Sequence, residues 1–128
     1  MGLGLSRDLL RLSDEELEKQ KNRGTLRFLS KTRKFGEILR GKESIGGMLQ
    51  QMGFKSVPSP QFPYPSHDEN YFNGGFIVRH HASFSDDSNF DSTQLEVTAS
   101  VRETPEARKK FSAALAAVLN NFIKLYQQ

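Results

Sequence analysis

A glutamate with apolar neighbours is the first candidate for chemistry in this sequence. Glu96 lies between Leu95 and Val97, in a segment whose polar and apolar residues alternate. Burial among apolar side chains would raise the pKa of Glu96, and a raised pKa suits a carboxylate to general-base catalysis. An edge-strand glutamate, or a salt-bridge partner of an arginine, is the favoured alternative from periodicity alone.

A second polar cluster comes earlier in the chain, at Arg79, His80 and His81. Alternation along a strand would place Arg79 and His81 on one face and His80 on the other. A catalytic zinc needs three convergent protein ligands, so two adjacent strand histidines are a poor metal pair. From chemistry alone, we expect this cluster to contact an anion or a substrate, or to lie on the surface.

Two strands and a long helix are predicted to position these residues. Apolar residues after Gly74-Gly75 predict a strand over about 74–82, a turn follows at 85–89, and the alternation around Glu96 predicts a strand over about 92–99. Thr104 as N-cap and proline at the next position predict a helix over 105–126. The expected buried stripe of that helix is Phe111, Ala114, Leu115, Val118, Phe122 and Leu125.

Shorter elements are predicted in the first half of the chain. A capping box at Ser13 and Glu16 predicts a helix that starts at Asp14 and ends near a left-handed Gly24. A short basic helix is expected to use Leu26, Leu29 and Phe35, and another helix to span 44–53 and close at Gly53. The proline-rich segment 57–65 is expected to be extended and packed on its own domain, although a ligand of proline-recognising domains has a similar composition.

Composition and charge exclude several classes of protein. The chain has 128 residues, no cysteine, 36% hydrophobic residues and a formal net charge of +3, which indicates one domain with a small core and no disulfide or thiolate metal site. No phosphate-binding GxxxxGK[ST] loop or GxSxG elbow occurs. No predicted membrane span or secretory signal is present, which indicates a cytoplasmic protein.

Seven cations and no acid occur between Lys19 and Lys34. Such a segment could contact RNA or an acidic protein, as a non-catalytic binding module. A solvated basic face is the favoured alternative, because no aromatic-rich nucleic-acid motif accompanies the charges.

The segments 71–81 and 93–97 together resemble the C-terminal part of the N-formylglutamate amidohydrolase family. That family has a Gly-Gly-aromatic strand ending in Arg/His, then a Gln-Ile/Leu-Glu strand, an arginine, and a terminal amphipathic helix. Arg102 and the helix from Pro105 stand in the last two places, and 43–46 and 57–60 are similar to the family's preceding region. The resemblance covers roughly residues 40–126.

The resemblance implies an α/β (or α+β) fold, a partial metallocarboxypeptidase-like sheet with flanking helices. It implies a zinc-dependent hydrolase that cleaves an N-acyl amino acid or a related amide, with Glu96 as general base. Arg79 and His81 would face the substrate, and Gly74 and Gly75 would let the backbone pass close to the ligand or a neighbouring strand. On this basis residues 1–42 form a basic helical part and residues 43–128 the C-terminal portion of an amidohydrolase-like domain.

Two departures from the family pattern concern the metal. The sequence has no histidine before His67, and Ala82 stands where the family usually has glycine. Three zinc ligands would require His67 to fold back onto His81 with a carboxylate such as Glu96 or Asp68. We therefore expect either the C-terminal part of a longer enzyme, incomplete or inactive alone, or a family descendant that has lost its metal, and in both cases a chain that binds no zinc alone. A bare apolar surface is expected to promote self-association or docking of a missing N-terminal half.

Overall fold

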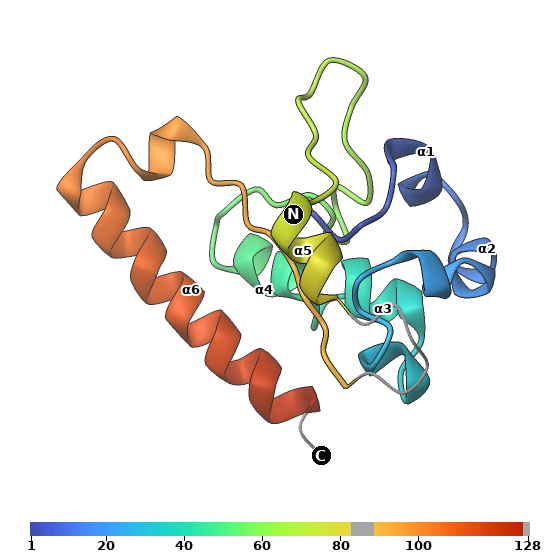
Figure 1. The fold of residues 1–128 in the computed structure, drawn as a ribbon. Coiled ribbons are helices and arrows are strands. Elements are labelled where there is room, and N and C mark those ends of the chain that lie inside the picture. The colour runs from blue at the N-terminus through green and yellow to red at the C-terminus, as the bar shows by residue number, and fades with distance from the viewer. Residues whose placement is uncertain (83–88, 127–128) are drawn as a thin grey trace.

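The computed structural model describes residues 1–82 and 89–126, and every regular element in these ranges is helical (Figure 1). The α-helices are α1 (Arg7–Leu10), α2 (Asp14–Lys19), α3 (Phe35–Arg40), α4 (Ile45–Gln51), α5 (Phe76–His81) and α6 (Pro105–Tyr126). Three 3-10 turns, η1 (Lys21–Arg23), η2 (Leu29–Lys31) and η3 (Ala99–Val101), complete the elements. The predicted α/β fold with a metallocarboxypeptidase-like sheet is therefore wrong, because the described residues contain no β-strand.

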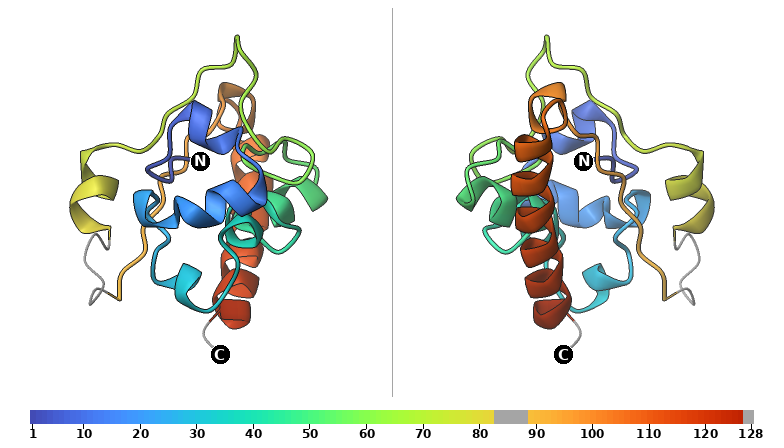
Figure 2. Two further views of the ribbon diagram at one scale, coloured as in Figure 1. Left: turned by 90° about the vertical axis from the view of Figure 1, so that its right-hand side faces the viewer. Right: turned by 90° about the vertical axis from the view of Figure 1, so that its left-hand side faces the viewer.

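The predicted strand over 74–82 is instead the short helix α5. Within α5 the buried residue is Val78, and the C-cap residue Ala82, four positions later, is buried as well. The apolar residues Phe76 and Ile77 point outward, with 78% and 71% of their surface exposed. Figure 2 shows α5 at the edge of the molecule opposite α4.

The predicted strand over 92–99 is extended but forms no ladder. Gln94 makes one isolated antiparallel bridge with Gly2, through N–H···O bonds of 2.8 and 2.9 Å. Two further bonds attach neighbouring backbone, from Gly4 N to Asn73 O (2.7 Å) and from Thr25 N to Leu3 O (3.0 Å). A β-sheet needs several successive residue pairs between two strands. This segment has one pair, so it is an extended connection held to the N-terminal segment by single hydrogen bonds. The turn expected over 85–89 falls at 85–88 outside the described residues.

The first apolar cluster joins the N-terminal segment to α1, α2 and α3. Its buried members are Leu3, Leu5, Leu10, Leu17, Leu26, Phe35, Ile38 and Leu39. The capping box is confirmed, since Ser13 Oγ accepts from Glu16 N and the Glu16 carboxylate accepts from Ser13 N. The left-handed ending at Gly24 is wrong: Gly24 is extended (φ −85°), and a Cβ there would lie 2.5 Å from the Phe35 ring. The single basic helix predicted around Leu29 is replaced by η2 and α3.

The second apolar cluster lies where α4 packs against α6 (Figure 1). Ser44 Oγ accepts from Gly47 N (3.0 Å) to cap α4, and Gly53 at φ +87° ends this region, as predicted. Thr104 Oγ1 accepts from Ala107 N (3.1 Å), which confirms the start of α6. Ala114 and Val118 are buried, whereas the rest of the predicted stripe is half-buried, because α6 covers only one side of the molecule.

The proline-rich segment packs on its own chain, as predicted. Pro58 and Pro65 are fully buried, and the Ser59 hydroxyl accepts from Phe62 N (3.2 Å) inside the segment. The extended course expected for this segment is wrong, because its backbone bends at 57–61 and 63–64 and Ser59 N donates to Phe62 O (2.9 Å). The rigid φ angles of its prolines restrict this bent connection between α4 and the loop before α5. It therefore supplies a fixed wall to the cavity described below.

Candidate functional site

The side chain of Gln94 joins the two segments that carry the candidate residues. Its Oε1 accepts from Gly75 N (2.7 Å), and its Nε2 donates to Glu96 Oε1. A Cβ at Gly75 would lie 3.0 Å from Gln94 Oε1, so the absence of a side chain at Gly75 allows this bond. The start of α5 and the segment around Glu96 are thereby held together, although they are about 20 residues apart in sequence.

Gly74 lies at the closest backbone approach in this region. It has φ +108°, in the left-handed region that favours glycine. A Cβ built on Gly2 would lie 2.5 Å from Gly74 N, so the two backbones touch. The expectation of a close backbone approach at Gly74 holds for a neighbouring segment, that of Gly2, rather than for a strand of a sheet.

Two guanidinium groups line a groove of about 580 Å³ beside α5, which we call the arginine groove. Arg79 is exposed and donates through Nη2 to Asn73 Oδ1 (3.1 Å) and Gly74 O (3.3 Å). Arg7 donates to the carbonyl oxygens of Ser66, His67 (3.0 Å) and Glu69 (2.7 Å). All of these acceptors are neutral, and no carboxylate among the described residues forms an ion pair with either guanidinium, so the groove favours anions.

The histidines do not join Arg79 in this groove. The His80 ring stacks on Phe76 with 5.1 Å between ring centroids, and the His81 ring meets His80 edge-on at 4.9 Å. The predicted shared face for Arg79 and His81 is wrong, because residues two apart diverge on a helix. His81 lines neither of the two cavities described here.

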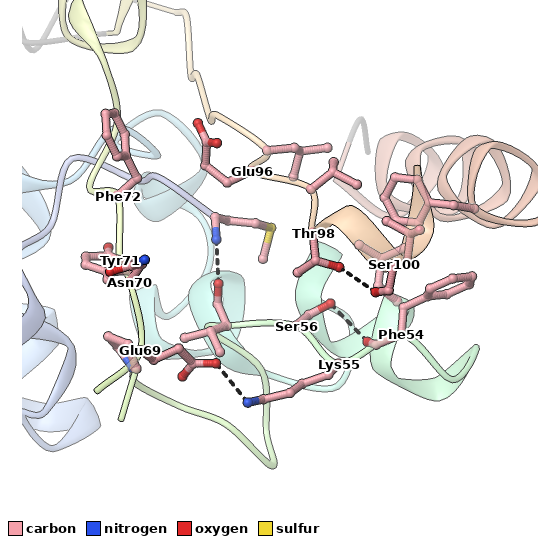
Figure 3. Close-up of a pocket in the computed structure, with 18 of the residues that line it drawn as sticks. Phe54, Lys55, Ser56, Glu69, Asn70, Tyr71, Phe72, Glu96, Thr98 and Ser100 are labelled. Carbon is pink, nitrogen blue, oxygen red and sulfur yellow. Dashed lines mark hydrogen bonds and ion pairs between the residues drawn. The ribbon is translucent and has the colours of Figure 1, made fainter. Parts of the chain in front are cut away.

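Glu96 lies at the rim of a second cavity of about 470 Å³, which we call the Glu96 pocket (Figure 3). Its walls come from residues 53–57, 69–72, 95–98 and 100–101, with Met1, Leu49, Pro65 and Phe111. The Glu96 side chain is exposed, so the desolvation predicted from its apolar neighbours is absent. That expectation depended on a paired strand, and the segment is unpaired beyond Gln94.

Three other charged groups belong to residues that line the Glu96 pocket: Lys55, Glu69 and the Met1 amine. Lys55 Nζ forms a 2.8 Å ion pair with Glu69 Oε1, and this contact holds the pKa of Glu69 below its ordinary value. The Met1 amine donates to Val57 O; burial lowers its pKa, while the charge of Glu96 acts in the opposite direction. The pocket therefore combines aromatic walls with one ion pair, a buried amine and the Glu96 carboxylate.

Tyr71 and Phe72 line both cavities. The Tyr71 hydroxyl donates to Leu5 O (2.9 Å), and burial raises the pKa of Tyr71 to about 12. The Tyr71 hydroxyl is therefore a fixed structural donor at neutral pH. Sequence reasoning missed Arg7 and Lys55 because both are brought in by contacts with a distant loop, and no local pattern marks them.

The donor set does not fit a zinc ion. Among residues 1–82 and 89–126, no group of three or more His, Asp or Glu side chains converges. His67 is 93% exposed and its Nδ1 lies 3.2 Å from Asp68 Oδ1, its sequence neighbour. The fold-back of His67 onto His81 and Glu96 that zinc would need is therefore not formed.

Several cations of the segment 19–34 contact their own chain. Lys21 pairs with Glu18 at 2.8 Å. The Arg33 guanidinium lies 5.5 Å from the Tyr126 ring centroid and donates to Leu125 O at 3.4 Å. These contacts fasten the segment to α2 and to the end of α6, and they give no added support to a nucleic-acid surface.

In comparisons with known proteins, no family model, curated protein or solved structure matches the chain. The similarity to the N-formylglutamate amidohydrolases thus stays a prediction from residues 71–81 and 93–97. Within the described part of the chain, none of the helices has the length and apolarity needed to cross a membrane.

Proposed function

We propose that the chain is the carboxylate-binding C-terminal segment of an N-formylglutamate amidohydrolase-like hydrolase, acting on an N-acyl amino acid or a related amide. The observation that carries this proposal is the Gln94 bridge. Both motif segments of the resemblance meet there, in a chain of hydrogen bonds that runs from Arg79 through Gly74 and Gly75 to Gln94 and Glu96.

In this proposal the arginine groove binds the carboxylate of the substrate. A planar guanidinium binds a carboxylate through two parallel N–H···O bonds, and a second cation from Arg7 adds to the attraction. Phe72 and Phe76 line the same groove and are 57% and 78% exposed, which leaves apolar surface for the rest of the ligand. In this proposal Glu96 is the general base, reached around Tyr71 and Phe72 from the adjoining pocket.

Zinc chemistry of the kind that the resemblance implies is not part of this proposal. The described donor groups do not fit the metal, so no step is assigned through it. The proposed roles of the chain are the binding of the carboxylate end of the substrate and general-base action by Glu96.

Calorimetric titration with N-formyl-L-glutamate tests the proposal. Arg79→Met should weaken binding by about 10- to 100-fold, the effect of losing one or two charge-assisted hydrogen bonds. The dimethyl ester of the ligand, which has no carboxylate, should bind no better to the parent chain than the free acid binds to Arg79→Met. Arg108→Met removes an exposed arginine that lines neither cavity and should leave the affinity unchanged. Equal affinities for acid and ester, or equal losses in both variants, would contradict the proposal.

A further inference from the structure

The Glu96 pocket has the dimensions of a small-molecule site. Its volume of about 470 Å³ falls within the range of ~300–1,000 Å³ found for ligand pockets. Three phenylalanines from separate parts of the chain line it, Phe54, Phe72 and Phe111, and the rings of Phe54 and Phe111 meet edge-on at 5.3 Å. An apolar body of aromatic size would find contacts on several sides.

The charged groups around the pocket determine which charge the polar end of such a ligand should carry. Lys55 and Glu69 neutralise each other at one end of the pocket (Figure 3). Glu96 and Phe72 line another part of the same pocket, and the Glu96 carboxylate accepts a hydrogen bond from the neutral Gln94 amide. No cationic side chain among the described residues forms an ion pair with Glu96.

Met1 contributes the other positive group that faces this pocket. Its amine already donates to Val57 O, and burial disfavours its charged form. The amine is therefore committed to Val57 O, and among the described residues it forms no ion pair with Glu96.

We propose that the Glu96 pocket binds an organic ammonium ion whose apolar body lies among the phenylalanines. A carboxylate beside an aromatic face attracts a cation through both its negative charge and the ring quadrupole. Arg7 and Arg79 line the arginine groove but not this pocket, so the ammonium site needs neither of them. It therefore does not rest on the proposed function, although Glu96 lines the pocket in both.

The probe for this site is 2-phenylethylammonium, and 2-phenylethanol is its uncharged match. Binding is followed by two-dimensional NMR of the labelled chain at pH 7. We expect the amine to bind at least about tenfold more tightly than the alcohol, the effect of one cation–π contact with a carboxylate partner. Glu96→Gln should remove that preference while both ligands still shift the resonances of Phe54 and Phe111.

Matched variants separate this proposal from a folding defect and from the proposed function. Glu103→Gln changes an exposed glutamate that lines neither cavity, and it should keep the tenfold preference. Arg79→Met should weaken N-formyl-L-glutamate and leave the amine unaffected. Equal binding of amine and alcohol, undetectable binding of the amine at about 10 mM, or a preference that survives Glu96→Gln in a normally folded variant would overturn the ammonium site.

Discussion

Replacement of Gln94 by alanine tests whether one side chain holds the candidate site together. The change removes the acceptor for Gly75 N and the donor to Glu96, but it leaves the backbone bridge to Gly2 in place. Loss of the bond to the half-buried Gly75 N–H should cost about 1 kcal/mol, and loss of the exposed bond to Glu96 about 0.5 kcal/mol more.

The expected thermal shift follows from the size of the chain. At about 2.1 cal/mol/K per residue, 128 residues have an unfolding entropy near 0.27 kcal/mol/K. A loss of about 1.5 kcal/mol then lowers Tm by about 5–6 °C. The same variant should weaken N-formyl-L-glutamate binding, because α5 and Arg79 lose their tether.

Differential scanning calorimetry of matched glutamine variants checks this result. Gln51→Ala removes one exposed bond to Lys42 O and should shift Tm by less than about 2 °C. Gln94→Glu keeps an acceptor for Gly75 but places a carboxylate beside Glu96. The Tm of this variant should therefore lie between those of the parent and Gln94→Ala. A Tm for Gln94→Ala equal to that of Gln51→Ala would refute the tethering role.

Four further predictions concern pH, metal, self-association and nucleic acid. The hydrogen bond from Lys21, then that from Phe35 N, lowers the pKa of Glu18 below its ordinary 4.5; the unfolded chain thus binds more protons, and stability should fall as the pH drops below 4.5. Chemical denaturation between pH 3 and 7 should show that the free energy of unfolding falls less at acid pH in Glu18→Gln than in Glu15→Gln. Elemental analysis should find far less than one zinc per chain; stoichiometric zinc, lost in His81→Ala, would overturn this. The exposed Phe72, Phe76 and Ile77 should cause self-association in light scattering, reduced in Phe76→Ser; a concentration-independent monomer would exclude it. RNA binding through residues 19–34, if it occurs, should fall steeply with salt, and none at about 50 mM salt would leave an ordinary basic face.

Local chemistry made the helix starts predictable. Ser13, Ser44 and Thr104 each bond to a backbone N–H three residues later, so the necessary information lies within one turn. Proline likewise fixes its own φ wherever it stands, but the extended course expected from this rule is wrong for the proline-rich segment, which bends.

Tertiary context decided the regions that were predicted wrongly. A short apolar run such as 76–78 fits a strand or a helix, and Val78 alone of this run is buried in the fold, so no repeated apolar spacing marks the helix. The side chains that form the arginine groove illustrate the same limit. Arg7 bonds to carbonyls about 60 residues away, and no periodicity in the sequence encodes that contact.

The bonds of residues 2–4 have a consequence for the order of folding. Gly2 and Gly4 bond to Gln94 and Asn73, which closes chain loops of about 70 to 90 residues at one place. Contacts of such long range form slowly, whereas α2, α4 and α6 have caps that can nucleate early. Both cavities border these closures, so they should be completed in the last stage of folding. Pulse-labelling hydrogen exchange should protect the amides of Gly2, Gly4 and Gln94 after those of α6, and ligand binding should recover with this late phase.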